Sequence, residues 1–164
     1  MLDNFFSIMS TSACLKSFQS FFLRLMLVAL AVIATGCASV NKAPASADAE
    51  AKQFKSNAAT SQVYVYRNET MGAAISMPVT VDGKLAGTTG ANSYFKFDLP
   101  AGDHKFTSQG DGSQLSVTTE LGKLYFIWQE VKMGAFAAGS KLQLVSDEVG
   151  KKAVLECARI QSTY

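Results

Sequence analysis

The stretch Gln62-Val63-Tyr64-Val65-Tyr66-Arg67 decides the fold, because the sequence changes here from small polar residues to alternation of two kinds of side chain. In an extended chain the two valines share one face and the two tyrosines share the other. The same period of two recurs at residues 79–82, 95–99, 115–121 and 142–144. The pattern therefore predicts antiparallel strands, each with one buried face and one solvated face.

Turn residues separate these runs and favour short connections. Asp82-Gly83 suits a tight hairpin, and residues 100–103, Pro-Ala-Gly-Asp, suit a second turn. Residues 124–131 are apolar on both sides, which is typical of a central strand covered on both faces. Seven or eight strands at this spacing predict a mostly β fold, a single small antiparallel β-sandwich over residues 62–164.

A short C-terminal helix is expected within residues 147–160. Asp147 can cap it, and the pairs Asp147 with Lys151 and Glu148 with Lys152 are four residues apart. Its inward side would carry Val149, Ala153, Val154 and Cys157. Gly150 argues against a helix here, because glycine is a poor helix former.

The N-terminal residues have the layout of a bacterial signal peptide. An uninterrupted apolar run fills residues 25–34, follows Lys16 and Arg24, and is half the length that a membrane-spanning helix needs. Residues 34–37, Ala-Thr-Gly-Cys, resemble the lipobox of bacterial lipoproteins, although the first residue is usually Leu. The resemblance implies cleavage after residue 36 and a diacylglyceryl group on Cys37.

The residues after Cys37 predict an address and a tether. By resemblance to Gram-negative lipoproteins, Ala38 and Ser39 in place of Asp imply the outer membrane, facing the periplasm, rather than the inner membrane. Residues 37–61 are rich in small and polar residues, with Phe54 as the one bulky side chain, so we expect a flexible tether with at most a short helical turn. Removing this tether should cost little stability.

Composition limits the remaining function classes. The 164 residues hold one ordinary domain, and removing residues 1–36 changes the formal charge from +2 to +1, because Lys16, Arg24 and Asp3 leave. No basic run exceeds Lys151-Lys152, so nucleic acid is not expected as a partner.

Several segments together carry a family resemblance. They are Ala49-Glu50-Ala51-Lys52-Gln53-Phe54, Val63-Tyr64-Val65-Tyr66-Arg67, Val81-Asp82-Gly83-Lys84, Ser93-Tyr94-Phe95, Leu99-Pro100-Ala101-Gly102-Asp103-His104, Tyr125-Phe126 and Val131-Lys132-Met133-Gly134. In this order they resemble the small bacterial lipoproteins built on domain of unknown function 2846. The middle part is also similar to β-sandwich modules of the PEGA and prealbumin-like kind. The resemblance implies a fold and an address and no particular activity.

Candidate chemical groups are few. His104 is the one histidine and has no cluster of further ligands around it in the sequence, so a structural role is expected and no metal or cofactor. Cys157 should act as a small buried hydrophobe, because Cys14 leaves with the signal peptide and Cys37 carries lipid. Trp128 alternates with Leu124 and Phe126 and is expected in the core.

The segment Met133-Gly134-Ala135-Phe136 is the remaining candidate site. It opens an apolar loop that ends at Gly139. The loop either folds over one end of the sandwich or forms an exposed lip for a protein partner or a lipid. We expect the first arrangement.

These residues bear on three possible functions. The preferred one is a non-enzymatic, membrane-anchored lipoprotein that interacts with other proteins of the cell envelope. The alternative is a module that binds a small molecule or a glycan, which would need a concave patch near Tyr94, Tyr125 or Trp128. An enzyme is not expected, because no paired titratable groups stand out in the sequence.

Overall fold

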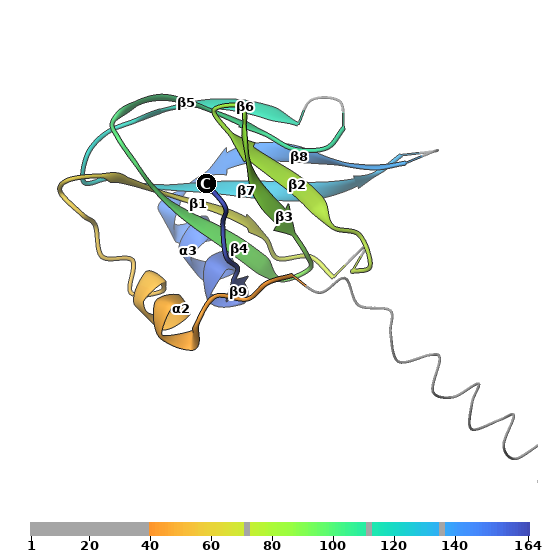
Figure 1. Cartoon of the computed structure of the whole chain (residues 1–164), viewed down its shortest axis with the longest axis horizontal. Helices are drawn as coiled ribbons and strands as arrows, with labels where there is room; N and C mark the ends of the chain where they lie inside the picture. Colours follow the sequence, from red (N-terminus) through yellow and green to blue (C-terminus); the bar gives the residue numbers. More distant parts are fainter. Residues whose placement is uncertain (1–39, 71–72, 111–112, 135–136) are drawn as a thin grey trace, which may run out of the picture. The chain divides into compact units, whose positions relative to one another are not determined.

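The computed structural model describes residues 40–70, 73–110, 113–134 and 137–164, which form two β-sheets and two helices (Figure 1). The five-stranded sheet has the order β8 (Ala138–Val145), β7 (Leu124–Met133), β1 (Ser61–Arg67), β4 (Ser93–Leu99), β9 (Ala158–Arg159). The four-stranded sheet has the order β3 (Lys84–Thr89), β2 (Met77–Val81), β5 (Gly102–Thr107), β6 (Gln114–Thr119). The helices are α2 (Ala45–Ala51) and α3 (Asp147–Leu155). This arrangement confirms the mostly β sandwich with a short C-terminal helix.

Strand β1 lies between β4 and β7, and all seven of its residues are buried. Val63 and Val65 point to the four-stranded sheet and form part of the main apolar cluster. Tyr64 and Tyr66 point the other way and belong to a second cluster with residues of α2 and α3. The expectation of one solvated face is wrong for this strand, because the helices cover the side that carries the tyrosines.

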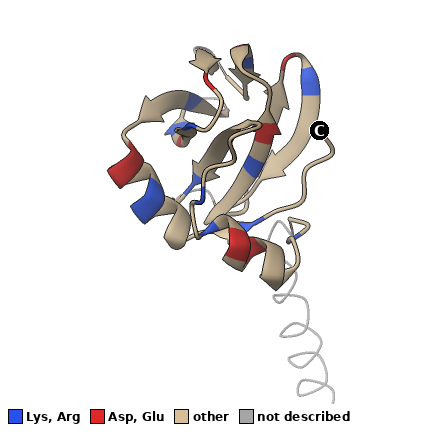
Figure 2. Ribbon diagram, turned by 90° about the vertical axis from the view of Figure 1, so that its left-hand side faces the viewer, with Lys and Arg blue, Asp and Glu red and all other residues tan. Residues whose placement is uncertain are grey.

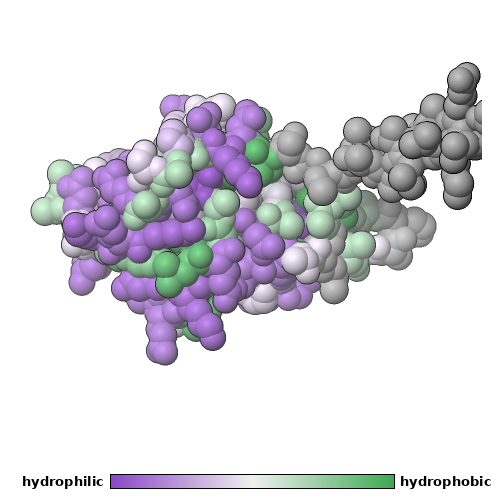
Figure 3. Space-filling model, turned by 90° about the horizontal axis from the view of Figure 1, so that it is seen from below, coloured by the Kyte–Doolittle hydropathy of each residue, from purple (hydrophilic) through white to green (hydrophobic). Residues whose placement is uncertain are grey.

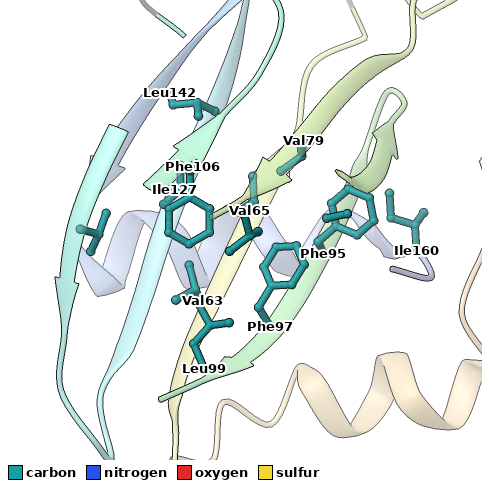
Figure 4. Close-up of a cluster of buried hydrophobic side chains, with 13 residues drawn as sticks. Val63, Val65, Val79, Phe95, Phe97, Leu99, Phe106, Ile127, Leu142 and Ile160 are labelled. Carbon is teal, nitrogen blue, oxygen red and sulfur yellow. The ribbon is translucent and has the colours of Figure 1, made fainter. Parts of the chain in front are cut away.

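The main core fills the space between the two sheets. Aromatic and branched side chains from both sheets meet there, and most of them are completely buried (Figure 4). The cluster comprises Val63, Val65, Val79, Val81, Ala86, Phe95, Phe97, Leu99, Phe106, Val117, Ile127, Leu142 and Ile160. Burying a side chain of this size stabilises a fold by about 1.5–3 kcal/mol, so this cluster is the principal stabilising contact between the sheets.

Two strand pairs are parallel, which the alternation pattern did not predict. β1 pairs with β7 in parallel register, from Gln62 opposite Leu124 to Tyr66 opposite Trp128, and β4 pairs in parallel with β9. Alternation reports which face of a strand is buried and carries no information on the direction of its neighbour. The chain can enter β7 parallel to β1 because β2 to β6 lie between them in the sequence.

Gly150 has a packing role that explains its place inside α3. A β-carbon at this position would lie 2.2 Å from the Cβ atom of Phe126, so only glycine lets the helix approach the sheet this closely. The helix ends at Leu155, and the remainder of the predicted range turns into β9. Asp147 is the first helical residue and pairs with Lys151 at 3.0 Å, whereas Ser146 occupies the cap position.

The prediction of a flexible tether over residues 37–61 is wrong for residues 40–61. α2 packs on the tyrosine face of β1: Ala51 is buried, and the Tyr64 hydroxyl donates a hydrogen bond of 2.9 Å to the Ala51 carbonyl. The Phe54 ring lies 5.6 Å from that of Tyr64 and 5.9 Å from that of Phe126. Composition indicated a tether because the segment is rich in small and polar residues. It could not reveal the aromatic partners, because they are remote in the sequence and form a surface only in the folded sheet.

The C-terminal residues cross from one sheet to the other. The Thr163 N–H donates to the Ala86 carbonyl at 2.9 Å, and the Tyr164 ring contacts that of Phe97 at 5.9 Å. At the opposite edge the Ser140 N–H donates to the Gln109 carbonyl at 2.7 Å. Both edges of the sandwich are therefore linked by backbone hydrogen bonds.

We predict that Phe54→Ala lowers the free energy of unfolding by about 1–3 kcal/mol, because it removes a half-buried ring from between two aromatic side chains. Urea unfolding of the chain from residue 38 onward measures this. Gln53→Ala changes an exposed neighbour and serves as the control. Equal stability of the two variants would show that the segment contributes nothing to the fold.

Candidate functional site

Asp82 and His104 come from two separate turns and meet in the structure. The His104 Nδ1 atom lies 2.7 Å from the Asp82 Oδ2 atom, and its Nε2 atom lies 3.0 Å from the Pro100 carbonyl oxygen. Asp82 Oδ1 also accepts the Lys105 N–H at 2.8 Å. The pair therefore fastens the β2–β3 hairpin to the start of β5, and His104 is buried between the two turns.

Both ring nitrogens of His104 face oxygen acceptors, so the doubly protonated imidazolium fits this position best. Burial disfavours its charge, but the hydrogen bonds to Asp82 and Pro100 and the nearby carboxylates outweigh burial, and the pKa of His104 lies above 6.5. For Asp82, burial is likewise outweighed by the Lys105 N–H and by His104, so its pKa lies below 3.8. With both nitrogens engaged, His104 has a structural role in this arrangement and no free nitrogen to act as a base.

Cys157 is buried, as expected of a small hydrophobe. Burial raises the pKa of its thiol to about 12, and its Sγ atom lies 3.6 Å from the Arg67 carbonyl. A reactive cysteine needs an accessible thiolate. The Cys157 sulfur is neither accessible nor ionised at neutral pH.

The three aromatic residues expected to mark a ligand patch have different surroundings. Tyr94 is completely buried, and its hydroxyl donates to Asp48 Oδ1 at 2.9 Å. Tyr125 packs against the main core, and its hydroxyl accepts the Glu120 N–H. Trp128 is only half-buried and lines a groove of about 440 Å³ beside α3. The structure therefore does not bring these three residues together.

The groove beside Trp128 has one apolar side and one charged side. Tyr66, Trp128 and Val149 supply the apolar surface, and Lys152 of α3 and Glu156, just after its end, supply the charged side. The Trp128 Nε1 atom is buried and has no hydrogen-bond partner within the described part of the chain. The expectation that Trp128 lies in the core is thus met in part, because the ring also packs against the second apolar cluster.

The loop that begins at Met133 is the tip of the β7–β8 hairpin. Met133 is 62% exposed, and the Gly134 N–H donates to the Ala137 carbonyl at 3.1 Å. Ala135 and Phe136 lie outside the described residues, as does Cys37. Whether Phe136 covers the sandwich therefore stays a prediction. Met133 does not cover it.

A buried polar network at the same end of the sandwich was missed by the sequence analysis. Gln129 is completely buried; its Oε1 atom accepts the Thr89 hydroxyl, and its Nε2 atom donates to the Ser108 hydroxyl at 2.6 Å. The Ser140 hydroxyl donates to Ser108 at 2.8 Å. These bonds join three strand ends and fix the base of the hairpin.

Arg67 is also completely buried at this end, and its Nη1 atom donates to the Ile75 carbonyl at 2.6 Å. Burial lowers the pKa of Arg67, and the negative charge of Glu69 opposes this. Glu69 in turn accepts the Val131 N–H at 2.9 Å. The alternation could have located both interior polar residues, because Arg67 follows Val65 and Gln129 follows Ile127 by two positions.

The charges show no strong preference for one sign. Acidic and basic residues are interspersed on the side seen in Figure 2. Over residues 40–70, 73–110, 113–134 and 137–164, no three His, Cys, Asp or Glu side chains come together in a way that could hold a metal ion. Among these same residues, no helix has the length and apolar character needed to cross a bilayer.

The fold is a small two-sheet β-sandwich with an apolar core, in which an aspartate–histidine pair joins two turns of the four-stranded sheet. The family of proteins of unknown function designated DUF2846 matches residues 57–140. A Haemophilus influenzae protein described as uncharacterized is 34% identical over 139 residues, which cover 83% of each chain. The chain belongs to the DUF2846 family, as the resemblance predicted. No solved structure matches it.

We predict that the protein becomes less stable as the pH rises from 6 to 8.5. A histidine with a raised pKa in the folded state contributes stability that is complete below pH 6.5 and is lost as the pH passes its folded value. His104 is the one histidine, but the Cys157 thiol, whose pKa is about 12 in the folded protein, ionises toward pH 8.5 in the unfolded chain and would add to the change. The experiment therefore uses the Cys157→Ala background, in which the change can be assigned to His104. Urea unfolding at both pH values measures it.

Asp82→Asn is the matched variant for this experiment, because it keeps an oxygen for the Lys105 N–H and removes the charge that stabilises the imidazolium. The loss of stability between pH 6 and 8.5 should then be smaller than in the unmodified protein. An unmodified protein with no pH dependence, or a variant with the full dependence, would contradict the role of the pair.

Proposed function

We propose that this protein is a non-catalytic lipoprotein of the cell envelope, held by lipid on Cys37 at the outer membrane and facing the periplasm, with its sandwich serving to bind other envelope proteins. One observation carries the proposal. Val40, which packs against the main core, lies only three residues after a cysteine that ends an apolar run and a lipobox-like sequence. Several acyl chains on one cysteine hold a protein far more firmly than a single chain, at about 0.8 kcal/mol for each buried methylene.

The state of the titratable groups supports a non-catalytic role. His104, Cys157 and Tyr94 are all buried, and each contributes to packing or to hydrogen bonds that join separate elements. General acid–base catalysis needs such groups within reach of a substrate. Ala38 and Ser39 support the outer membrane as the address, by the resemblance already described.

We predict that Cys37→Ala produces an unprocessed or soluble protein, because the substitution removes the atom that would carry the lipid. Fractionation of membranes, together with incorporation of labelled palmitate, measures the effect. Cys157→Ala is the matched control, since it removes the buried thiol and should leave acylation unchanged. Equal labelling of the Cys37→Ala protein would refute the anchor. Recovery of monomer alone after cross-linking in intact cells would refute the proposal that the sandwich binds other envelope proteins.

A second candidate function is the binding of a small molecule or glycan in the groove beside Trp128. The observation that favours it is a partly exposed indole ring next to Lys152 and Glu156, in a groove of about 440 Å³. Aromatic faces and a few polar groups are typical of such sites. This function is compatible with the same anchor.

Trp128 is the one tryptophan of the chain, so its fluorescence reports on this groove directly. If the groove is a binding site, extracts of periplasmic metabolites or cell-wall glycans should shift the emission of Trp128 in a saturable manner. Val149→Arg, which places a bulky charged side chain at an exposed rim position, should abolish the shift. An unchanged spectrum with every fraction would contradict this second function.

A further inference from the structure

We propose that the end of the sandwich at which Val40 lies, including the β7–β8 hairpin, rests against the phospholipid surface that holds the lipid of Cys37. This inference depends on the proposed function, since it assumes that Cys37 is acylated. The domain would then have a defined orientation at the membrane, rather than moving freely on a long flexible tether.

The first described residues are attached firmly to the domain. The Ala43 N–H donates to the Arg159 carbonyl at 2.9 Å, and the Gln161 N–H donates to the Asn41 carbonyl at 2.8 Å. Between these bonds Lys42 forms an antiparallel bridge with Ile160. Val40 itself packs against the main apolar core. Val40 is therefore fixed to the domain, and the covalent link from it back to Cys37 is only three residues long.

The length of this link limits the distance of the domain from the membrane. Each residue of an extended chain spans at most about 3.3–3.6 Å, so three steps reach about 10–11 Å from Cys37 to Val40. The headgroup layer on one side of a bilayer is about 5–8 Å thick. A lipid-bearing cysteine lies at this layer, so the surface around Val40 cannot move far from it.

The sheet topology identifies the elements that share this end. A hollow of about 420 Å³ is lined by Val40, by Asn92 just before β4 and by Leu155 at the end of α3. β1 ends opposite the start of β4, at Arg67 and Ser93. Because β7 runs parallel to β1, it also ends on this side, and Figure 1 shows β7 and β8 extending toward the end where the described chain begins.

The hairpin reaches beyond the other elements of this end. β7 pairs with β1 as far as Trp128 opposite Tyr66 and continues to Met133. Five further residues of strand correspond to about 16–17 Å. The hydrogen bonds of Gln129 and Ser140 fix the base of the hairpin, so this extension has a defined direction.

The exposed side chains of this end suit a lipid surface. Met133 is 62% exposed and Leu155 is 56% exposed, and Figure 3 shows pale green residues toward the right as well as a stronger green patch near the middle of the face. Lys132, which pairs with Glu130, precedes Met133 in the chain, and the exposed Lys42 lines the hollow together with Leu155. Apolar side chains flanked by lysines match the boundary between acyl chains and phosphates. The short link brings this surface, rather than another, to the membrane.

The test uses the mature protein, from Cys37 onward and acylated at that residue, in vesicles of phosphatidylethanolamine and phosphatidylglycerol. Met133→Cys and Leu155→Cys each provide an exposed thiol for an environment-sensitive fluorophore, while the buried Cys157 stays unlabelled. Leu121→Cys is the matched control. It is 52% exposed and lies just before the start of β7, at the opposite end of that strand.

We expect nitroxide-labelled phospholipids to quench the fluorophore at positions 133 and 155 at least about twofold more than at position 121. Equal quenching at all three positions, in protein that still floats with the vesicles, would overturn the orientation and leave the anchor intact. Protein that carries no lipid on Cys37 by mass spectrometry and does not float would overturn the anchor and the orientation together. The two failures are therefore distinguishable.

Discussion

Strand β1 has no solvated side, and the rest of the structure follows from this. Its valines need an apolar layer on one face, which the four-stranded sheet supplies, and its tyrosines need cover on the other, which α2 and α3 supply. Its two edges are satisfied by β4 and β7. A central strand of this kind excludes water from both of its faces, so losing either layer would expose large aromatic or branched side chains.

The close approach of the helices depends on small and polar details of the sequence. Gly150 lets α3 lie directly on Phe126, and the carbonyl of Ala51 accepts the Tyr64 hydroxyl, which would otherwise be buried without a partner. Asp48 serves two elements at once, because its Oδ1 atom accepts both the Tyr94 hydroxyl and the Arg159 N–H. Residues 40–61 are thus part of the domain, because these hydrogen bonds and ring contacts attach them to both β1 and β9.

Charged side chains join separate loops and strands of the fold. Asp82 and His104 connect two turns of the four-stranded sheet, and Glu69, just after β1, accepts the Val131 N–H of β7. Buried charged groups are stable only where hydrogen bonds and opposite charges compensate for lost hydration. These contacts specify which loops meet.

The sequence alone determined the mostly β sandwich, the extent of most strands, the C-terminal helix and the family, because period-two alternation, turn residues and motif order are local properties that survive without a structure. It could not determine the parallel pairing of β1 with β7, the cover on the tyrosine face or the partner of His104. These depend on residues remote in the chain, such as Phe54 against Phe126 and Asp82 against His104. The tertiary structure alone decided that residues 40–61 belong to the domain, since the aromatic surface that binds them exists only after β1, β4 and β7 have come together.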